Sequence, residues 1–305
     1  MRSNETAPRP VAGSHGRPDP LGVALRLALE SHPTDLAGAA LIIARLEYPH
    51  LDRGRSLRTL DELGAWAAER LKDIDPGDLR SRVKRLNRFF YGECGFAGNR
   101  DWYSDVRNSM LNVVIERRRG IPITLALVYM EVARRAGLTV RGIAFPGHFL
   151  LQVPSGLRPR ERAEADLILD PFNSGAVLSE TDCRRLLSSH MGDDVPFRST
   201  MLHPCSPAHV VARLLNNLKR IYIDLRAFAY ARRVTDLLLA LDPTLLYELR
   251  DRGLLSYHLD DFPAALRDLE DYLRLHAWTD AGPRRERDTL QQHVVVLRRR
   301  VVSFN

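Results

Sequence analysis

The stretch that decides the fold runs from Arg117 to Phe172. It reads RRRGIPITLALVYMEVARRAGL (117–138), TVRGIAFPGHFLLQV (139–153) and, after a polar segment, LILDPF (167–172). The first part is apolar on nearly all sides after Pro122, which predicts a helix buried against a sheet, and Gly137 is a natural end for it. The other parts have strand composition, and the Pro146-Gly147 turn predicts an antiparallel hairpin followed by a third strand.

His148 opens the second of these predicted strands, and Asp170 closes the third. A His and an Asp at facing strand positions, after a helix start in the chain, are two of the three residues of a Cys-His-Asp site for hydrolysis or acyl transfer. One His with one Asp falls short of the three or four ligands of a metal site. We therefore expect neither a metal nor a cofactor, and the missing nucleophile becomes the central question.

The composition bounds the class of protein. The chain has 305 residues, 45% of them hydrophobic, enough for one large or two modest domains. It lacks a run of 18 apolar residues, so we expect no membrane span. The first 20 residues are polar and Pro-rich, which predicts a disordered segment and, in the absence of an apolar signal-peptide core, a cytoplasmic protein.

Charge and cysteine content exclude further classes. The net charge of +7 comes almost entirely from arginines spread along the chain, without a nucleic-acid-binding motif, so we expect no nucleic-acid partner. Cys94, Cys183 and Cys205 form an odd set without CxxC spacing, which predicts reduced thiols rather than disulfides.

The remaining chain suggests two domains. Amphipathic segments precede the deciding stretch, so residues 21–195 are predicted to form one domain with N-terminal helices, and residues 196–207 a linker. Residues 208–305 contain helices with short turns and a repeat of about 34 residues. There Gly253, Tyr257, Ala264 and Leu269 resemble a tetratricopeptide repeat, whose concave face binds peptides or protein segments. We expect an unknown protein or peptide partner.

These motifs together resemble the bacterial SirB-one family. The resemblance rests on EYPHLD, FYGECGFAGNRDWYSDVRNSM, the buried helix, GIAFPGHFLLQV, LILDPF and the repeat helices, over roughly residues 35–277. It implies an α+β, transglutaminase-like (cysteine-protease-like) core with N-terminal helices and an antiparallel sheet, followed by an all-α tetratricopeptide-type region. In the wider superfamily, Gly-x-Cys begins the central helix. Here Gly120 matches the Gly, His148 the His and Asp170 the Asp, but Pro122 stands at the Cys position.

Proline offers no nucleophile, so two hypotheses follow. The first is a non-catalytic binding or scaffold protein that keeps His148 and Asp170 as a structural pair or as part of a pocket. The second is a hydrolase or acyltransferase with another nucleophile, Cys94 or a hydroxyl. A thiol or hydroxyl within about 4 Å of His148 would favour the second. The Gly- and aromatic-rich loop and the helix start supply the other candidate pocket residues: Asn99, Tyr103, Asn108, Ser109, Pro122, Thr124 and Tyr129.

Overall fold

The computed structural model describes residues 19–155, 166–276 and 284–303. The chain forms two compact units: one runs from Leu27 to Asn217, and the other joins the chain before Leu27 to the chain from Leu218 onward. Residues 1–18 of the predicted disordered segment (1–20) lie outside the described residues, and Pro20 begins a helix. None of the helices in the described ranges is long and apolar enough to cross a membrane.

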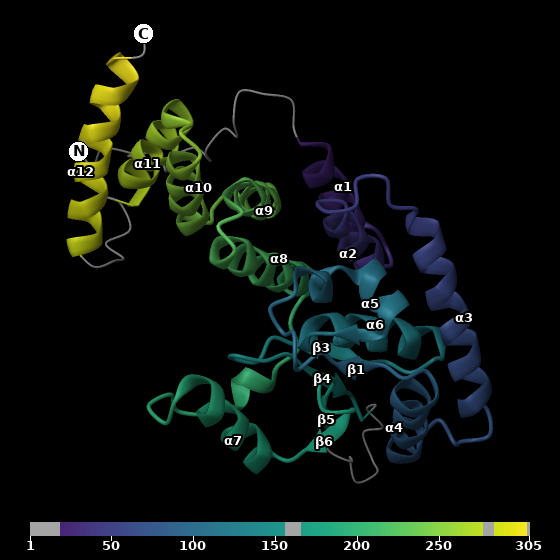
Figure 1. Cartoon of the computed structure of the whole chain (residues 1–305). Helices are drawn as coiled ribbons and strands as arrows, with labels where there is room; N and C mark the ends of the chain where they lie inside the picture. Colours follow the sequence, from purple (N-terminus) through teal and green to yellow (C-terminus); the bar gives the residue numbers. More distant parts are fainter. Residues whose placement is uncertain (1–18, 156–165, 277–283, 304–305) are drawn as a thin grey trace, which may run out of the picture. The chain divides into compact units, whose positions relative to one another are not determined.

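The first unit is built around one buried helix, α6 (Pro122–Arg135), in which every residue from Pro122 to Ala133 is buried. It packs against α2, α3 and α5 and against β3 and β4, which confirms the predicted helix buried on a sheet (Figure 1). The helices before α6 are α1 (Pro20–Glu30), whose residues up to Arg26 belong to the other unit, and α2 (Leu36–Ala44), α3 (Arg53–Leu71), α4 (Leu79–Asn87) and α5 (Leu111–Arg117).

An antiparallel sheet of four short strands lies next to α6. The strands are β3 (Arg141–Ile143), β4 (Leu150–Val153), β5 (Leu167–Asp170) and β6 (Ala176–Leu178), hydrogen-bonded in that order. The hairpin and the third strand were predicted, whereas β6 was not. His148 lies in the bend two residues before β4, and Asp170 is the last residue of β5. Helices with one small antiparallel sheet confirm the α+β class.

The Gly-rich loop before α5 is more regular than its sequence suggests. A π-helix, η1 (Arg88–Glu93), follows α4, and a 3-10 turn, η2 (Val106–Ser109), precedes α5. Between them, β1 (Ala97–Gly98) pairs in parallel with β2 (Arg119–Gly120). Because β2 leads directly into α6, this pairing fixes the loop beside the start of the central helix.

The chain leaves the sheet through α7 (Glu180–Met191), whose first turn is closed by a capping box between Ser179 and Asp182. Cys183 and Leu187 of α7 pack into a buried cluster with Ile143, Phe145 and Leu150. The predicted linker contains the 3-10 turn η3 (Ser199–Leu202) and reaches α8 at Pro207. The boundaries assigned to the domains from sequence stay predictions.

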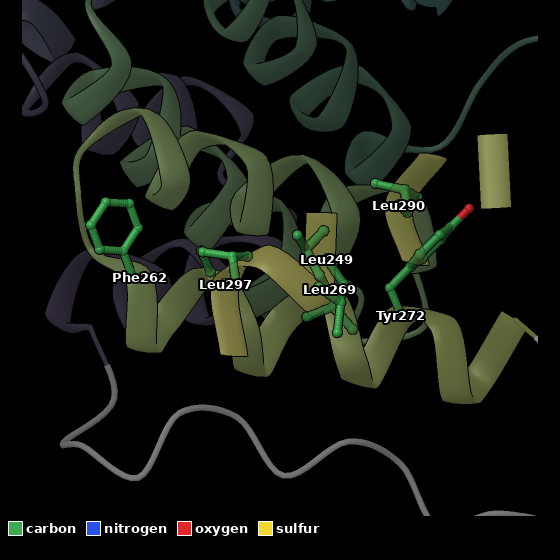
Figure 2. Packing of buried hydrophobic residues seen from close by; sticks show 8 residues of the cluster. Leu249, Phe262, Leu269, Tyr272, Leu290 and Leu297 are labelled. Carbon is green, nitrogen blue, oxygen red and sulfur yellow. The ribbon is translucent and has the colours of Figure 1, made fainter. Parts of the chain in front are cut away.

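The second unit is all helical. Its helices are α8 (Pro207–Asp224), which enters it at Leu218, α9 (Phe228–Leu241), α10 (Leu246–His258), α11 (Phe262–His276) and α12 (Arg284–Ser303). Leu249, Phe262, Leu269 and Leu297 belong to its apolar core (Figure 2). A Cβ at Gly253 would come within 2.8 Å of the Leu269 side chain, so glycine is needed where α10 crosses α11.

Two ion-pair networks join helices of this unit. Lys219 Nζ of α8 donates to both carboxylate oxygens of Glu248 and to Asp251 on α10, at 2.7–2.8 Å. Arg252 of α10 pairs with Asp236 of α9 at 3.1 Å and with Asp268 of α11 at 2.7 Å. The Lys219 and Arg252 side chains are both largely buried. Each pairs with carboxylates on other helices of this unit.

Candidate functional site

His148 and Asp170 meet as the sequence predicted. His148 Nε2 lies 2.9 Å from Asp170 Oδ1, and the two side chains are 5% and 2% exposed. Asp170 Oδ1 also accepts the backbone N–H of Phe172 at 2.9 Å, so it acts as an acceptor. His148 Nε2 therefore carries the proton and donates it to Asp170, and Nδ1 is the other ring nitrogen, free to accept or to bind a second proton.

Asp170 is held as a carboxylate. Burial disfavours its ionised form, but hydrogen bonds from His148 and Asn173 outweigh burial and hold the pKa of the carboxyl below its usual value. Asn173 Nδ2 donates to Oδ2 at 2.5 Å. Asn173 Oδ1 in turn accepts a hydrogen bond from Arg100. One amide thus connects the Asp170 carboxylate to a guanidinium of the Gly-rich loop.

Phe172 links the loop to the pair. The Arg100 guanidinium lies over its ring at 5.0 Å from the centroid. A Cβ at Gly98 would come within 2.5 Å of that ring, so only glycine lets strand β1 approach it. The tight packing fixes Phe172 beside His148, with ring centroids 6.3 Å apart.

Four rings stand in a row across the site, in the order Tyr103, Phe172, His148 and His190. Tyr103 meets Phe172 edge-on at 5.8 Å, and His190 stacks on His148 at 5.4 Å. Tyr103 is 38% exposed and His190 is exposed, whereas His148 is 6% exposed. The row therefore opens to solvent at both ends and is closed over the His-Asp pair. We call these four residues the ring row.

Gly147 allows this stack to form. Its φ of +71° is in the left-handed region. A Cβ there would come within 2.5 Å of His190 Cβ, so the turn before His148 and the last part of α7 approach closely only through a glycine. Partial burial, and then the neighbouring His148, lower the pKa of His190, so its ring is neutral near neutral pH.

Thr124 and two asparagines form a second cluster at the start of α6. Thr124 Oγ1 donates to the Asn108 carbonyl at 2.7 Å and accepts the Ile121 N–H at 3.1 Å. Asn108 Oδ1 accepts from Asn99 Nδ2 at 2.9 Å, and Asn108 Nδ2 donates to the Trp102 carbonyl at 2.6 Å. These side chains hold the loop in place, and the one O–H of Thr124 is donated to a backbone carbonyl.

The other predicted pocket residues take different places. Pro122 is the first residue of α6. Ser109 is fully buried, and its hydroxyl has no hydrogen-bond partner among the described residues. Tyr129 is buried in the core and donates to Asn87 Oδ1 at 2.9 Å. Burial raises the pKa of Tyr129, so its phenol stays protonated.

None of the three thiols is activated. Burial is the largest influence on each, and it raises the pKa of Cys94, of Cys205 and of Cys183, the last to about 11. Cys205 Sγ donates to the Gly142 carbonyl at 3.3 Å. Within the described residues no hydrogen bond joins His148 to a Cys, Ser or Thr. A nucleophile needs such a contact with its base or a lowered pKa.

Sequence reasoning missed His190, Arg100, Phe172 and Asn173. Phe172 and Asn173 follow Asp170 in the motif DPFN, so a turn directly after the strand-ending Asp was a local signal for them. His190 and Arg100 left no such signal, because each reaches the site only through long-range packing.

The domain descriptions of known families match both parts of the chain. Residues 55–216 match the description "Transglutaminase-like superfamily". Residues 218–293 match "Tetratricopeptide repeat". The second match includes the end of α8 and all of α9, whose sequence shows the repeat less clearly than that of α10 and α11.

Individual relatives share most of the chain. A "UPF0162 protein" of Xylella fastidiosa is 36% identical over 247 residues, 80% of this chain and 85% of that protein. "Protein SirB1" of Salmonella typhimurium is 28% identical over 215 residues, 70% and 76% of the two chains. "F-box only protein 21" of Mus musculus is 31% identical over 192 residues, 61% of this chain but 30% of that protein. The chain therefore belongs to the transglutaminase-like superfamily, within the SirB1 and UPF0162 group, in which this domain is followed by tetratricopeptide repeats.

Proposed function

We propose that this chain is a non-catalytic binding protein, whose transglutaminase-like core and helical repeats present surfaces to another protein. The proposal places it in the cytoplasm, a compartment in which three unpaired cysteines stay reduced. The partner is a protein or peptide segment, the ligand class that helical repeats bind on their concave face.

The observation that carries the proposal is that, among the described residues, no activated nucleophile contacts the His-Asp pair. Pro122 begins α6, where a helix N-terminus would favour a thiolate. Thr124, the first hydroxyl of that helix, uses its donor and acceptor capacity on backbone groups. The thiols that exist elsewhere are held in the neutral form by burial.

The repeat region supplies the second support. Tyr247 of α10 is 51% exposed, and the Arg250 guanidinium lies over its ring at 5.3 Å. Exposed aromatic rings backed by arginine are enriched where proteins contact one another. We therefore expect Tyr247 to contact the partner.

One observation favours the alternative, a hydrolase or acyltransferase with an unrecognised nucleophile. His148 donates Nε2–H to Asp170, which leaves Nδ1 unprotonated in the neutral ring, as a general base requires. The two readings differ in one measurable property, because only the enzyme releases product from an amide or ester substrate.

The experiment uses the full chain. Ammonia release from glutamine peptides and hydrolysis of activated esters are measured for the wild type and for His148→Gln. We expect both proteins to match the buffer background. Turnover by the wild type that disappears in His148→Gln would overturn the non-catalytic proposal.

Partner binding is tested separately. The tagged full chain captures proteins from bacterial lysate, and Tyr247→Ala is compared with Tyr230→Ala on α9, whose side chain is 38% exposed. We expect a protein that is retained by the wild type and by Tyr230→Ala to be lost by Tyr247→Ala. Equal capture by all three would exclude Tyr247 from the binding surface.

A further inference from the structure

A groove lies between helices α11 and α12 of the second unit. Its volume is about 380 Å³, within the range of sites that hold ligand side chains. We call it the α11–α12 groove, and its lining residues are Glu270, Leu273, Gln291, Val294, Val295 and Arg298. All of them belong to the same compact unit. Tyr247 of α10 does not line this groove, so it is a different surface from the one assigned to the partner above.

The side of α12 next to the groove is apolar where a solvated helix face is normally polar. Leu290 and Leu297 of α12 lie in the apolar core of the unit (Figure 2). Val295 and Val296 are instead 49% and 47% exposed, and Val295 borders the groove. Two adjacent, half-exposed valines beside a groove favour contact with another molecule.

The charge of α12 indicates the chemistry of that molecule. The helix contains six arginines against two acidic residues. Arg298 pairs with Glu270 at 2.7 Å, but the two side chains are 63% and 38% exposed, and an ion pair at such positions stabilises little. Arg299 is exposed and has no ion pair among the described residues. An excess of positive charge beside exposed valines favours an acidic, partly apolar partner.

The same observations argue against two other occupants. A second copy of the chain that paired through α12 would bring a second set of arginines to the first, and like charges repel. A lipid surface takes up the main apolar face of a basic helix. In α12 that face, with Leu290, Val294 and Leu297, is buried in the core of the unit.

We propose that the α11–α12 groove binds an acidic amphipathic helix of a partner protein. A groove between two packed helices accepts the ridge of side chains on a third helix. The apolar side chains of the partner helix contact Val295 and Val296, and its carboxylates face Arg298 and Arg299. The inference goes beyond the proposed function, which assigns partner contact to Tyr247 on α10.

Fluorescence anisotropy on the full chain tests the proposal. The probe is a labelled, blocked peptide with two repeats of Glu-Leu-Ala-Glu-Leu-Leu-Ala, which places leucines on one helix face and glutamates beside them. One comparison peptide has Lys in place of Glu, and another has Ala in place of Leu. We expect saturable binding of the Glu peptide below about 1 mM at low salt. Both comparison peptides should bind at least about tenfold more weakly, and added salt should weaken the Glu peptide severalfold.

Variants locate the site. Val295→Asp should lower the affinity at least about fivefold, because it replaces an apolar contact with a charge that repels the peptide. Val177→Asp is the matched control, since Val177 of β6 is also 49% exposed, and it should bind like the wild type. Arg299→Glu should weaken the Glu peptide and strengthen the Lys peptide, whereas Arg233→Glu, at an exposed position of α9, should do neither. A reversed preference cannot result from unfolding, so Arg299→Glu keeps the test decisive.

Several outcomes would overturn the proposal. They are no binding of the Glu peptide, equal binding of the Lys peptide, or wild-type affinity in Val295→Asp. Tighter binding of phosphatidylglycerol vesicles would identify a lipid surface as the occupant, and a dimer in sedimentation that Val295→Asp dissociates would identify a second copy.

Tyr247→Ala separates this proposal from the proposed function. We expect Tyr247→Ala to bind the Glu peptide like the wild type. Loss of the peptide by Tyr247→Ala, with Val295→Asp unaffected, would place the contact on α10 and overturn the α11–α12 site while leaving the proposed function standing.

Discussion

Removal of the Asp170 carboxylate by Asp170→Ala should destabilise the unit that contains the sheet. Asp170 accepts hydrogen bonds from His148, from the backbone of Phe172 and from both nitrogens of Asn173. Phe172 is half-buried and Asn173 exposed, so their donors can turn to water, but the His148 ring, 6% exposed, cannot. The buried His148 N–H is then left without an acceptor and a charge-assisted hydrogen bond is lost, which lowers the free energy of unfolding by about 2–4 kcal/mol.

Thermal melting followed by circular dichroism measures this cost. We expect the melting temperature to fall by about 5–12 °C, from the usual sensitivity of a domain of this size. Asp166→Ala is the matched control, because Asp166 is an exposed carboxylate just before β5 that bonds Gln152 and Ser155. It should melt close to the wild type. Equal melting of the two variants would refute the structural account of the pair.

The same carboxylate gives a dependence on pH. Its pKa is lowered in the folded protein, so its contribution is complete above the pKa of the unfolded state and is lost as pH falls through the folded pKa. The difference in unfolding free energy between the wild type and Asp170→Asn should therefore shrink as pH falls below about 4, as measured by urea titration. A difference that grows as pH falls below 4 would contradict the assignment.

Three further changes test other contacts. Arg252→Met leaves two carboxylates of neighbouring helices without their cation and should cost about 3–5 kcal/mol in urea unfolding of the repeat region, with the exposed Arg274→Met as a near-neutral control. Gly147→Ala should lower the melting temperature by several degrees, since it combines a positive φ with a clash on His190; a wild-type melting curve would contradict that packing. Cys183 should resist iodoacetamide at neutral pH until the protein is unfolded, as read by mass spectrometry, and rapid native labelling would disprove its burial.

The central part of the fold followed from sequence because its signals are local and strong. The run after Pro122 is apolar all round, and Pro146-Gly147 separates two runs of strand composition, so helix and hairpin could be placed by pattern alone. The contact of His148 with Asp170 followed from their positions at strand ends. Strand β6 could not be predicted, because Ala176 and Val177 are exposed and give no alternation between buried and exposed positions.

The surroundings of the pair were beyond sequence reasoning for a physical reason. His190 reaches His148 from the last turns of α7. Arg100 is linked to Asp170 through the side-chain amide of Asn173, which is 73 residues from Arg100 in the sequence. Such contacts depend on how elements pack, and residue spacing carries no record of them. The same holds for the Thr124 hydroxyl, whose hydrogen bonds to the Asn108 carbonyl and the Ile121 N–H could not be read from its position in the sequence.

Strand β6 also limits how the sheet can meet other chains. It is a free edge, with Val177 49% exposed, and free edges invite pairing with strands from other molecules. Here the edge is three residues long and ends at the capping box of Ser179, which turns the chain into α7 at once. So short an edge gives an incoming strand few backbone hydrogen bonds. A short edge disfavours aggregation through β6, and at this edge we expect a partner to be recognised by side chains rather than by added strands.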